Sequence, residues 1–182
     1  MPLEHALLVA LREQPASGLD LAKRFDRSIG FFWHATHQQI YRVLARMDAD
    51  GWVRVTTVAQ SGRPDKKVYD VTPAGAEVLR AWLAAPTEAE PLRSELAVKL
   101  RGASFGDRDA VLDVVRANLA DHHLRLDHYR GLMARDYPRP GELSADDALE
   151  LDHYLVLRGG ILLEEMWIAW LTEYLTRHLE RT

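Results

Sequence analysis

Three consecutive segments with helical spacing of apolar residues occupy the first third of the chain, and they most constrain its fold. In the first segment, residues 3–13, the apolar side chains fall on one side of a helix. The second begins after Ser17, which we predict to be its N-cap. The third begins after Thr36, a possible N-cap, and stops at Gly51. The chain is therefore predicted to open with three helices.

A basic hairpin is predicted to follow the third helix. The run WVRVTTVAQ alternates and is rich in β-branched residues, and VYDV alternates again. The turn SGRPDKK between them is positively charged, and its proline stiffens the tip. Thr72 then caps a fourth helix that has Pro73 at its first position.

The segment APTEAEPL, with two prolines and two glutamates, marks a predicted domain boundary. We expect residues 1–85 to form one domain and residues 86–182 to form a second, all-helical domain. The second contains a short amphipathic run, SELAVKLRG, a long helix from about 107 to 135, and a last helix from about 144 to 179. The predicted fold class is mainly α with a small β-hairpin.

Charge and composition narrow the classes of function. The net charge of −4 divides into +2 over residues 1–85 and −6 over residues 86–182. The positive charge thus lies in the half with the hairpin, which would be useful for contact with a polyanion, although a net charge of +2 is small. The chain has no cysteine, which excludes disulfides, thiol catalysis and thiolate metal sites and suits the cytoplasm. We expect neither a secretory signal nor a membrane span.

Three helices followed by a basic hairpin form the element order of a winged helix-turn-helix, in which the third helix enters the DNA major groove and the hairpin, or wing, contacts the backbone or the minor groove. Glutamines on the third helix can pair with adenine edges, and its arginines with guanine or phosphate. Cations of the wing would add salt-sensitive phosphate contacts. The residues predicted to contact DNA are Ser17, Lys23, Thr36, His37, Gln38, Gln39, Tyr41, Arg42, Arg46, Arg63, Lys66 and Lys67.

The same stretch resembles the PadR family of bacterial transcriptional regulators. The matching residues are Tyr41, Leu44, Asp50, Gly51, Gly62, Arg63, Pro64, Tyr69, Thr72 and Gly75. The helical remainder is similar in organisation to the larger PadR subgroup, which has a virulence-activator-type C-terminal domain. The resemblance implies a sequence-specific homodimeric repressor, whose C-terminal helices exchange across a two-fold axis and hold two winged helices over a pseudo-palindromic operator. Gln38, Gln39 and Ile40 depart from the family pattern, so the operator sequence does not carry over.

The second domain presents more apolar surface than its own three helices are expected to cover. A coiled-coil-like seam runs along the long helix, and the last helix is apolar on two sides, which favours a two-fold dimer. The aromatic residues Trp167, Trp170 and Tyr174 of the last helix can line a pocket for a small aromatic effector or simply fill a core or interface. The pair Gly159-Gly160 in the same helix allows close approach of another helix or of a ligand. The residues predicted for the dimer interface or effector pocket are Leu119, Leu126, Tyr129, Gly159, Gly160, Leu163, Trp167, Trp170 and Tyr174.

Other classes of function find little support in the residues. No phosphate-binding glycine loop, nucleophile elbow or metal-His-Glu motif occurs, so an enzyme is not expected. The eight histidines have no distinctive metal-ligand spacing, and we predict neither a metal site nor a cofactor. The alternative to a DNA-binding regulator is a winged helix that has become a protein-interaction module without DNA binding.

Overall fold

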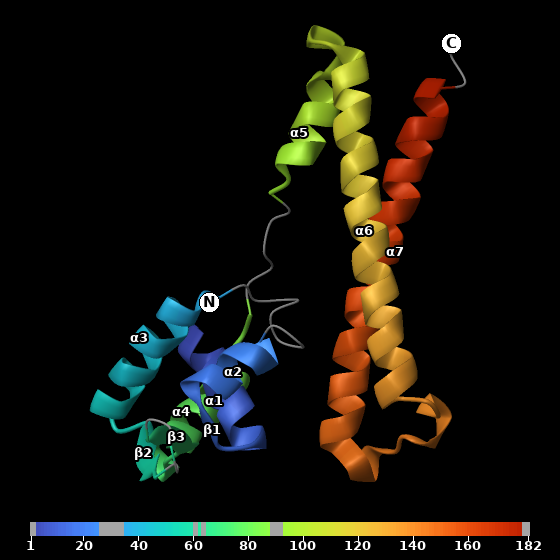
Figure 1. Cartoon of the computed structure of the whole chain (residues 1–182). Helices are drawn as coiled ribbons and strands as arrows, with labels where there is room; N and C mark the ends of the chain where they lie inside the picture. The colour runs from blue at the N-terminus through green and yellow to red at the C-terminus, as the bar shows by residue number, and fades with distance from the viewer. Residues whose placement is uncertain (1–2, 26–34, 60–61, 63–64, 88–92, 180–182) are drawn as a thin grey trace. The chain divides into compact units, whose positions relative to one another are not determined.

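The chain is organised as two compact units, residues 1–89 and residues 90–182 (Figure 1). The first unit combines helices with a small sheet, and the second is built from helices. The computed structural model describes residues 3–25, 35–59, 62, 65–87 and 93–179.

The first unit begins with the predicted run of three helices. Both predicted N-caps are confirmed, because the hydroxyl of Ser17 accepts a hydrogen bond from the backbone N–H of Asp20, and that of Thr36 from Gln39. Gly51 has the positive φ of 71° expected where a helix must stop. The elements in chain order are α1 (Leu3–Glu13), β1 (Ala16–Ser17), α2 (Gly18–Phe25), α3 (His37–Ala49), β2 (Val53–Val58), β3 (Lys66–Val71) and α4 (Pro73–Leu83).

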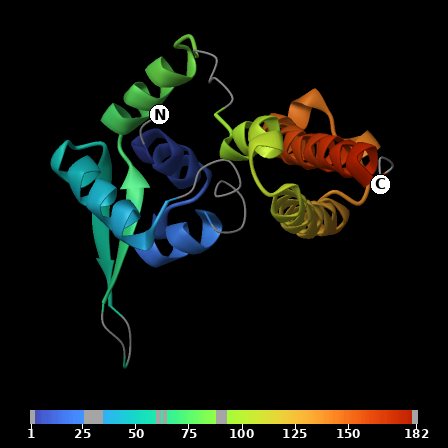
Figure 2. The same cartoon turned by 90° about the horizontal axis from the view of Figure 1, so that it is seen from above.

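The predicted hairpin belongs to a three-stranded antiparallel sheet with the order β1-β3-β2. β2 and β3 pair from Val53 opposite Val71 to Val58 opposite Lys66, so β3 begins two residues before the alternating run that predicted it. β1 was not predicted, because two residues are too few to show an alternation. Figure 2 shows the hairpin extending from the helices of its unit as a narrow ribbon.

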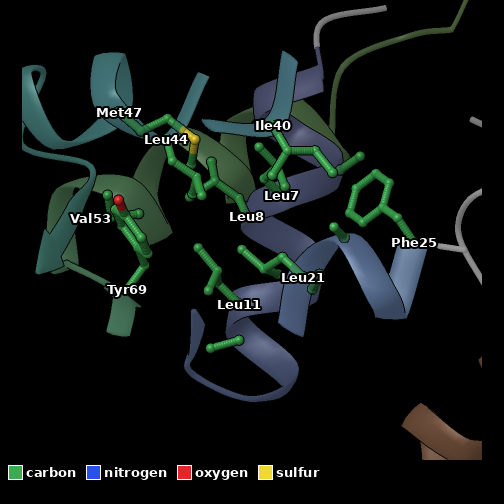
Figure 3. Packing of buried hydrophobic residues seen from close by; sticks show 14 of the residues in the cluster. Leu7, Leu8, Leu11, Leu21, Phe25, Ile40, Leu44, Met47, Val53 and Tyr69 are labelled. Atoms are coloured by element: carbon green, nitrogen blue, oxygen red, sulfur yellow. The ribbon is translucent and has the colours of Figure 1, made fainter. Parts of the chain in front are cut away.

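The apolar faces of α1, α2 and α3 meet in one core (Figure 3). Leu7 and Leu8 of α1, together with Leu44 of α3, are fully buried. Tyr69 of β3 closes the side of the core next to the sheet. Because each of these helices is short, packing of its apolar face supplies most of its stability.

The start of α4 is held by a close backbone contact. The Thr72 hydroxyl donates to the Gly51 carbonyl at 2.6 Å and accepts from the Gly75 N–H at 3.1 Å. A Cβ added at Gly75 would lie 2.1 Å from the carbonyl oxygen of Trp52. The Thr-Pro-Ala-Gly sequence thus places the start of α4 directly against the backbone of Trp52, just before β2, and a side chain at Gly75 requires that backbone to move.

In the second unit, α6 and α7 run antiparallel along each other (Figure 1). α7 of the same chain is the partner of the predicted seam, since Leu112, Val115 and Leu126 of that seam are buried. None of the described helices is long and apolar enough to cross a membrane. The elements are α5 (Glu95–Gly102), η2 (Ala103–Phe105), α6 (Arg108–Asp136), η3 (Pro140–Glu142), η4 (Ala145–Asp147) and α7 (Ala148–Leu179).

We predict that Gly75→Ala lowers the free energy of unfolding by about 2 kcal/mol, because the backbone carbonyl of Trp52 has to move to admit the methyl group. Gly131→Ala is the matched control. A Cβ at Gly131, inside α6, meets nothing within 4 Å, so this substitution should be neutral or stabilising. Urea denaturation followed by circular dichroism measures both, and equal effects of the two substitutions would contradict the proposed contact.

Candidate nucleic-acid interface

The helix α3 has one buried and one exposed face. Ile40, Leu44 and Met47 are completely buried in the core of the first unit. Gln38 and Arg42, one helical turn apart, lie on the opposite face and are exposed. Within the described part of the chain neither side chain has a hydrogen bond or an ion pair, so amide and guanidinium groups are free to bind a ligand.

Two of the residues predicted to contact DNA cap the N-terminus of α3. The backbone N–H of Thr36 donates to the Gln39 side-chain oxygen at 2.8 Å, and the backbone N–H of Gln39 donates to the Thr36 hydroxyl at 3.2 Å. This reciprocal capping box satisfies two backbone N–H groups at the start of the helix. Of the predicted glutamine pair, Gln38 is therefore the side chain that is free, and Gln39 has a structural role.

Two further residues of α3 are tied to neighbouring helices. The Arg46 guanidinium lies 2.7 Å from the Glu4 carboxylate of α1. Tyr41 packs over Gly18 at the start of α2, where an added Cβ would lie 2.3 Å from the ring. Arg46 and Tyr41 are still exposed at the surface, but their contacts also orient α3 on α1 and α2.

Of the two lysines of the wing, one forms an ion pair and the other has no partner among the described residues. Lys66 Nζ lies 2.7 Å from the Asp20 carboxylate of α2. Lys67 is exposed and has no hydrogen bond or ion pair in the described part of the chain. On neighbouring positions of a strand the two side chains point to opposite faces. Arg63, predicted as a third cation of the wing, lies outside the described residues.

The other predicted residues of the first unit differ in exposure. Lys23 in the last turn of α2 and His37 at the start of α3 are exposed. Ser17 is 8% exposed, and its hydroxyl donates to the Asp20 carboxylate at 2.8 Å. The structure thus assigns Ser17 to capping α2, which leaves it almost no surface for a ligand.

Sequence reasoning did not predict the ion pairs that the acidic residues Glu4 and Asp20 make. The Ser-x-x-Asp spacing from Ser17 to Asp20 signals a helix cap, but it does not indicate that Asp20 also pairs with Lys66, which is distant in sequence. Such pairs depend on which elements the fold brings together. They decide which basic residues remain free.

In the second unit, several residues predicted for an interface are buried within their own chain. Leu126 and Tyr129 are each 5% exposed. Leu119 is half-buried and Gly160 is buried. Tyr174 is half-buried, and its hydroxyl donates to the Leu100 carbonyl of α5 at 3.4 Å. These positions therefore stabilise the helical unit itself.

Of the remaining predicted positions, Gly159, Leu163 and Trp170 lie on one side of α7, and Trp167 lies toward α6. Leu163 and Trp170 are 52% and 37% exposed. A Cβ added at Gly159 would meet nothing within 4 Å among the residues that the structure describes. Trp167 is half-buried and stacks on His122 of α6, with ring centroids 5.2 Å apart.

A buried polar cluster joins the middle of α6 to α7. His122 Nδ1 lies 2.5 Å from the Glu164 carboxylate, which also accepts from Arg125 Nε at 3.1 Å. His122 and Glu164 are each 9% exposed. Both were visible in the sequence as polar interruptions of apolar stretches, but their pairing across two helices was not. The neighbouring Glu165 points elsewhere and binds Arg130, as expected for adjacent helical positions.

Comparisons with known proteins agree with this organisation. Residues 7–81 match the profile described as "Transcriptional regulator PadR-like family", and residues 92–178 match "Virulence activator alpha C-term". A curated relative, "Probable transcriptional regulator Rv1176c" of Mycobacterium tuberculosis, is 50% identical, and the alignment covers 95% of each chain. The chain belongs to the PadR-like family. Since this is a family of transcriptional regulators, the predictions of family and of a non-enzyme are confirmed.

Relatives in this family include proteins of known structure. The "Negative transcriptional regulator PadR" of Bacillus subtilis is 30% identical over 95% of each chain. Its structure with operator DNA has a TM-score of 0.84 and 27% identity over 96% of each chain. The virulence activator AphA of Vibrio cholerae has a TM-score of 0.79 and 31% identity over 100% of each chain. The predicted winged helix-turn-helix followed by long C-terminal helices is confirmed.

Proposed function

We propose that this PadR-like regulator is a cytoplasmic, sequence-specific DNA-binding repressor that works as a homodimer on a pseudo-palindromic operator. The observation that carries the proposal is the exposed face of α3, where Gln38 and Arg42 stand opposite the buried side chains of the same helix. An amide and a guanidinium on one face of a helix can read adenine and guanine edges in the major groove. The Bacillus subtilis PadR, a negative regulator, is known in complex with operator DNA.

The pairing of side chains in the structure supports a division of the proposed DNA-contact residues. Gln38 and Arg42 are assigned to base edges because both are exposed and neither has a hydrogen bond or ion pair with another described residue. His37 and Lys67 are assigned to phosphates, which add affinity without sequence information. Arg46 keeps its ion pair with Glu4 and contributes less to base recognition than Arg42.

The exposed side of α7 is the proposed dimer interface. Its apolar residues follow one another at helical spacing on the side opposite the buried face. Apolar surface of this extent on one helix is typical of an interaction site. Gly159 lies within this stripe and leaves room for close approach of a partner helix. The residues of the stripe, which are between 37% and 54% exposed, are Leu155, Val156, Leu162, Leu163, Met166 and Trp170.

A small aromatic acid is the proposed effector. The Bacillus subtilis PadR is known in complex with p-coumaric acid, in a structure with a TM-score of 0.78 and 27% identity to this chain. In the second unit, Trp167 and Trp170 lie with ring centroids 5.2 Å apart, and Arg125 is exposed on α6. His122 links these groups, because its ring stacks on Trp167 and its Nδ1 lies 2.7 Å from Arg125. An aromatic carboxylate bound on the tryptophan rings would compete with Glu164 for Arg125. The effector would act by binding one dimer geometry better than another.

Arg42→Ala should weaken operator binding by roughly 1–3 kcal/mol and reduce the preference for operator over random DNA. Lys67→Gln should instead weaken binding to all DNA alike and lower the slope of log affinity against log salt by about 1. Fluorescence anisotropy on labelled DNA from the upstream region of its own gene, at several salt concentrations and with unlabelled competitor, measures both effects.

Arg116→Ala is the control for lost positive charge, because Arg116 is exposed on α6 and pairs only with Asp113 of its own helix in the described structure. It should leave DNA binding unchanged. If the wild-type protein shows no operator preference, or if Arg42→Ala behaves like the control, the proposed recognition helix is wrong and the protein-interaction module becomes the better hypothesis.

Met166→Glu should convert the dimer into a monomer, because the charge would be buried without a partner in the middle of the apolar stripe. Light scattering after size exclusion should give twice the 20.7 kDa chain mass for the wild type and 20.7 kDa for the variant. Thr176→Glu adds the same charge at an exposed polar position of α7 and should remain dimeric. A monomeric wild type would contradict the proposed interface.

p-Coumaric acid should release the protein from its operator in a concentration-dependent way, with quenching of tryptophan fluorescence over the same range. p-Coumaramide, which keeps the ring but lacks the carboxylate, is the matched control and should act much more weakly. Unchanged anisotropy at millimolar concentrations of p-coumaric and related aromatic acids would contradict this effector class.

A further inference from the structure

The wing is attached to α2 through one carboxylate. Asp20 Oδ2 accepts from Lys66 Nζ at 2.7 Å and from the Ser17 hydroxyl at 2.8 Å. The backbone N–H of Asp20 donates back to the Ser17 hydroxyl at 3.2 Å. These two bonds with Ser17 fix the Asp20 side chain at the N-terminus of α2, so Lys66 meets an acceptor that is already oriented.

The position of Lys66 in the sheet makes this contact important for the wing. β1 pairs with β3 at Tyr69 and Val68, and its described pairing ends there. Lys66 lies two residues further toward the turn, where β3 is paired only with β2, opposite Val58. A two-stranded ribbon is marginally stable by itself. The ion pair with Asp20 thus holds the β2–β3 ribbon to the helices beyond the last pairing with β1.

The same helix also contacts the recognition helix. Gly18 at the start of α2 packs under Tyr41 of α3, two residues before Asp20. One turn of α2 therefore touches both proposed DNA-binding elements, α3 at Gly18 and the wing at Asp20. A displacement of the wing from Asp20 would change its position relative to α3, and with it the fit of both elements to one duplex.

The ion pair with Asp20 changes the role expected of Lys66, which the sequence predicted to contact a phosphate of DNA. Lys66 Nζ is in direct contact with a carboxylate, and the hydrogen bond from Lys66, followed by that from Ser17, holds the pKa of Asp20 below its ordinary value. Asp20 is therefore ionised at neutral pH, and the pair has no net charge. A neutral pair releases fewer counterions from DNA than a free lysine does.

We propose that Asp20 is a positioning residue for DNA recognition, which holds the wing through Lys66, and that Lys67 supplies the phosphate contact of this strand. The inference rests on the proposed DNA-binding function. It assigns Lys66 a structural role in place of the phosphate contact expected from the sequence.

The rival possibility makes the opposite prediction. If Lys66 leaves Asp20 to bind a phosphate, Asp20 is a competitor that also repels DNA. Its neutralisation would then raise affinity and steepen the salt dependence. If Asp20 positions the wing, its neutralisation lowers affinity although it removes a negative charge. The sign of the change distinguishes the two.

The test compares Asp20→Asn with the wild type by anisotropy on the same upstream DNA at several salt concentrations. Asparagine keeps the size of the side chain and an acceptor for Ser17, but it loses the charge that holds Lys66. The expected result is a roughly two- to fivefold weaker affinity, in the range of an exposed ion pair, with a salt slope no shallower than that of the wild type.

Asp65→Asn is the matched control for removing a negative charge near the wing. Asp65 is exposed just before β3 and has no hydrogen bond or ion pair in the described part of the chain. Its neutralisation should leave affinity unchanged or raise it. Lys66→Gln breaks the same contact without altering the cap of α2, and it should reproduce the loss of affinity with a salt slope like that of the wild type. The double variant should bind no more weakly than Lys66→Gln alone, because Asp20 acts through Lys66.

The outcomes separate this inference from the proposed function. If the wild type binds its operator but Asp20→Asn binds equally well or more tightly, or if Lys66→Gln reduces the salt slope as Lys67→Gln does, the positioning role is wrong and the function stands. If the wild type binds no DNA, both are wrong. Should Asp20→Asn fail to fold, as judged by circular dichroism, Lys66→Gln and its salt slope decide the question.

Discussion

Burial of the apolar face of α3 is the constraint on which the rest of the first unit depends. Ile40, Leu44 and Met47 are completely withdrawn from solvent against α1 and α2, and this fixes the rotation of the helix about its axis. With that rotation fixed, Gln38 and Arg42 face outward. A helix of thirteen residues would not hold such an orientation alone, because its stability comes mainly from tertiary packing. The proposed recognition of DNA bases by α3 therefore depends on the packing of the core, which sets the orientation of the helix.

Ion pairs and helix caps then decide which polar side chains have a structural role and which remain available to contact DNA. Gln39 completes the capping box with Thr36, and Arg46 joins α3 to α1 through Glu4. Lys66 joins the wing to α2 through Asp20. Individual surface ion pairs add little to stability, but here each joins two elements whose relative position matters for binding. Positive charge on the surface is thus not equivalent to capacity for DNA contact.

The second unit shows a similar division between faces. The buried side of α7 carries Glu164, which pairs with His122 and Arg125 of α6. An isolated charge at this depth would be costly, so the three groups are needed together. The opposite side of the same helix is an apolar stripe that the described residues of the second unit leave exposed. α7 thus packs against α6 of its own chain on one side and carries the proposed dimer interface on the other.

The sequence by itself determined the element order, the helix caps at Ser17, Thr36 and Thr72, and the winged-helix class, because periodicity and capping are local properties of consecutive residues. It also placed the free side chains Gln38, Arg42 and Lys67 among the candidates for DNA contact. The two-residue strand β1 was missed because so short a segment has no detectable period. Only the tertiary structure decided that Arg46 and Lys66 are paired, that Ser17 is buried, and that Leu126 and Tyr129 pack inside their own chain. Each of these depends on residues far apart in sequence, whose meeting is set by the packing of whole helices and strands.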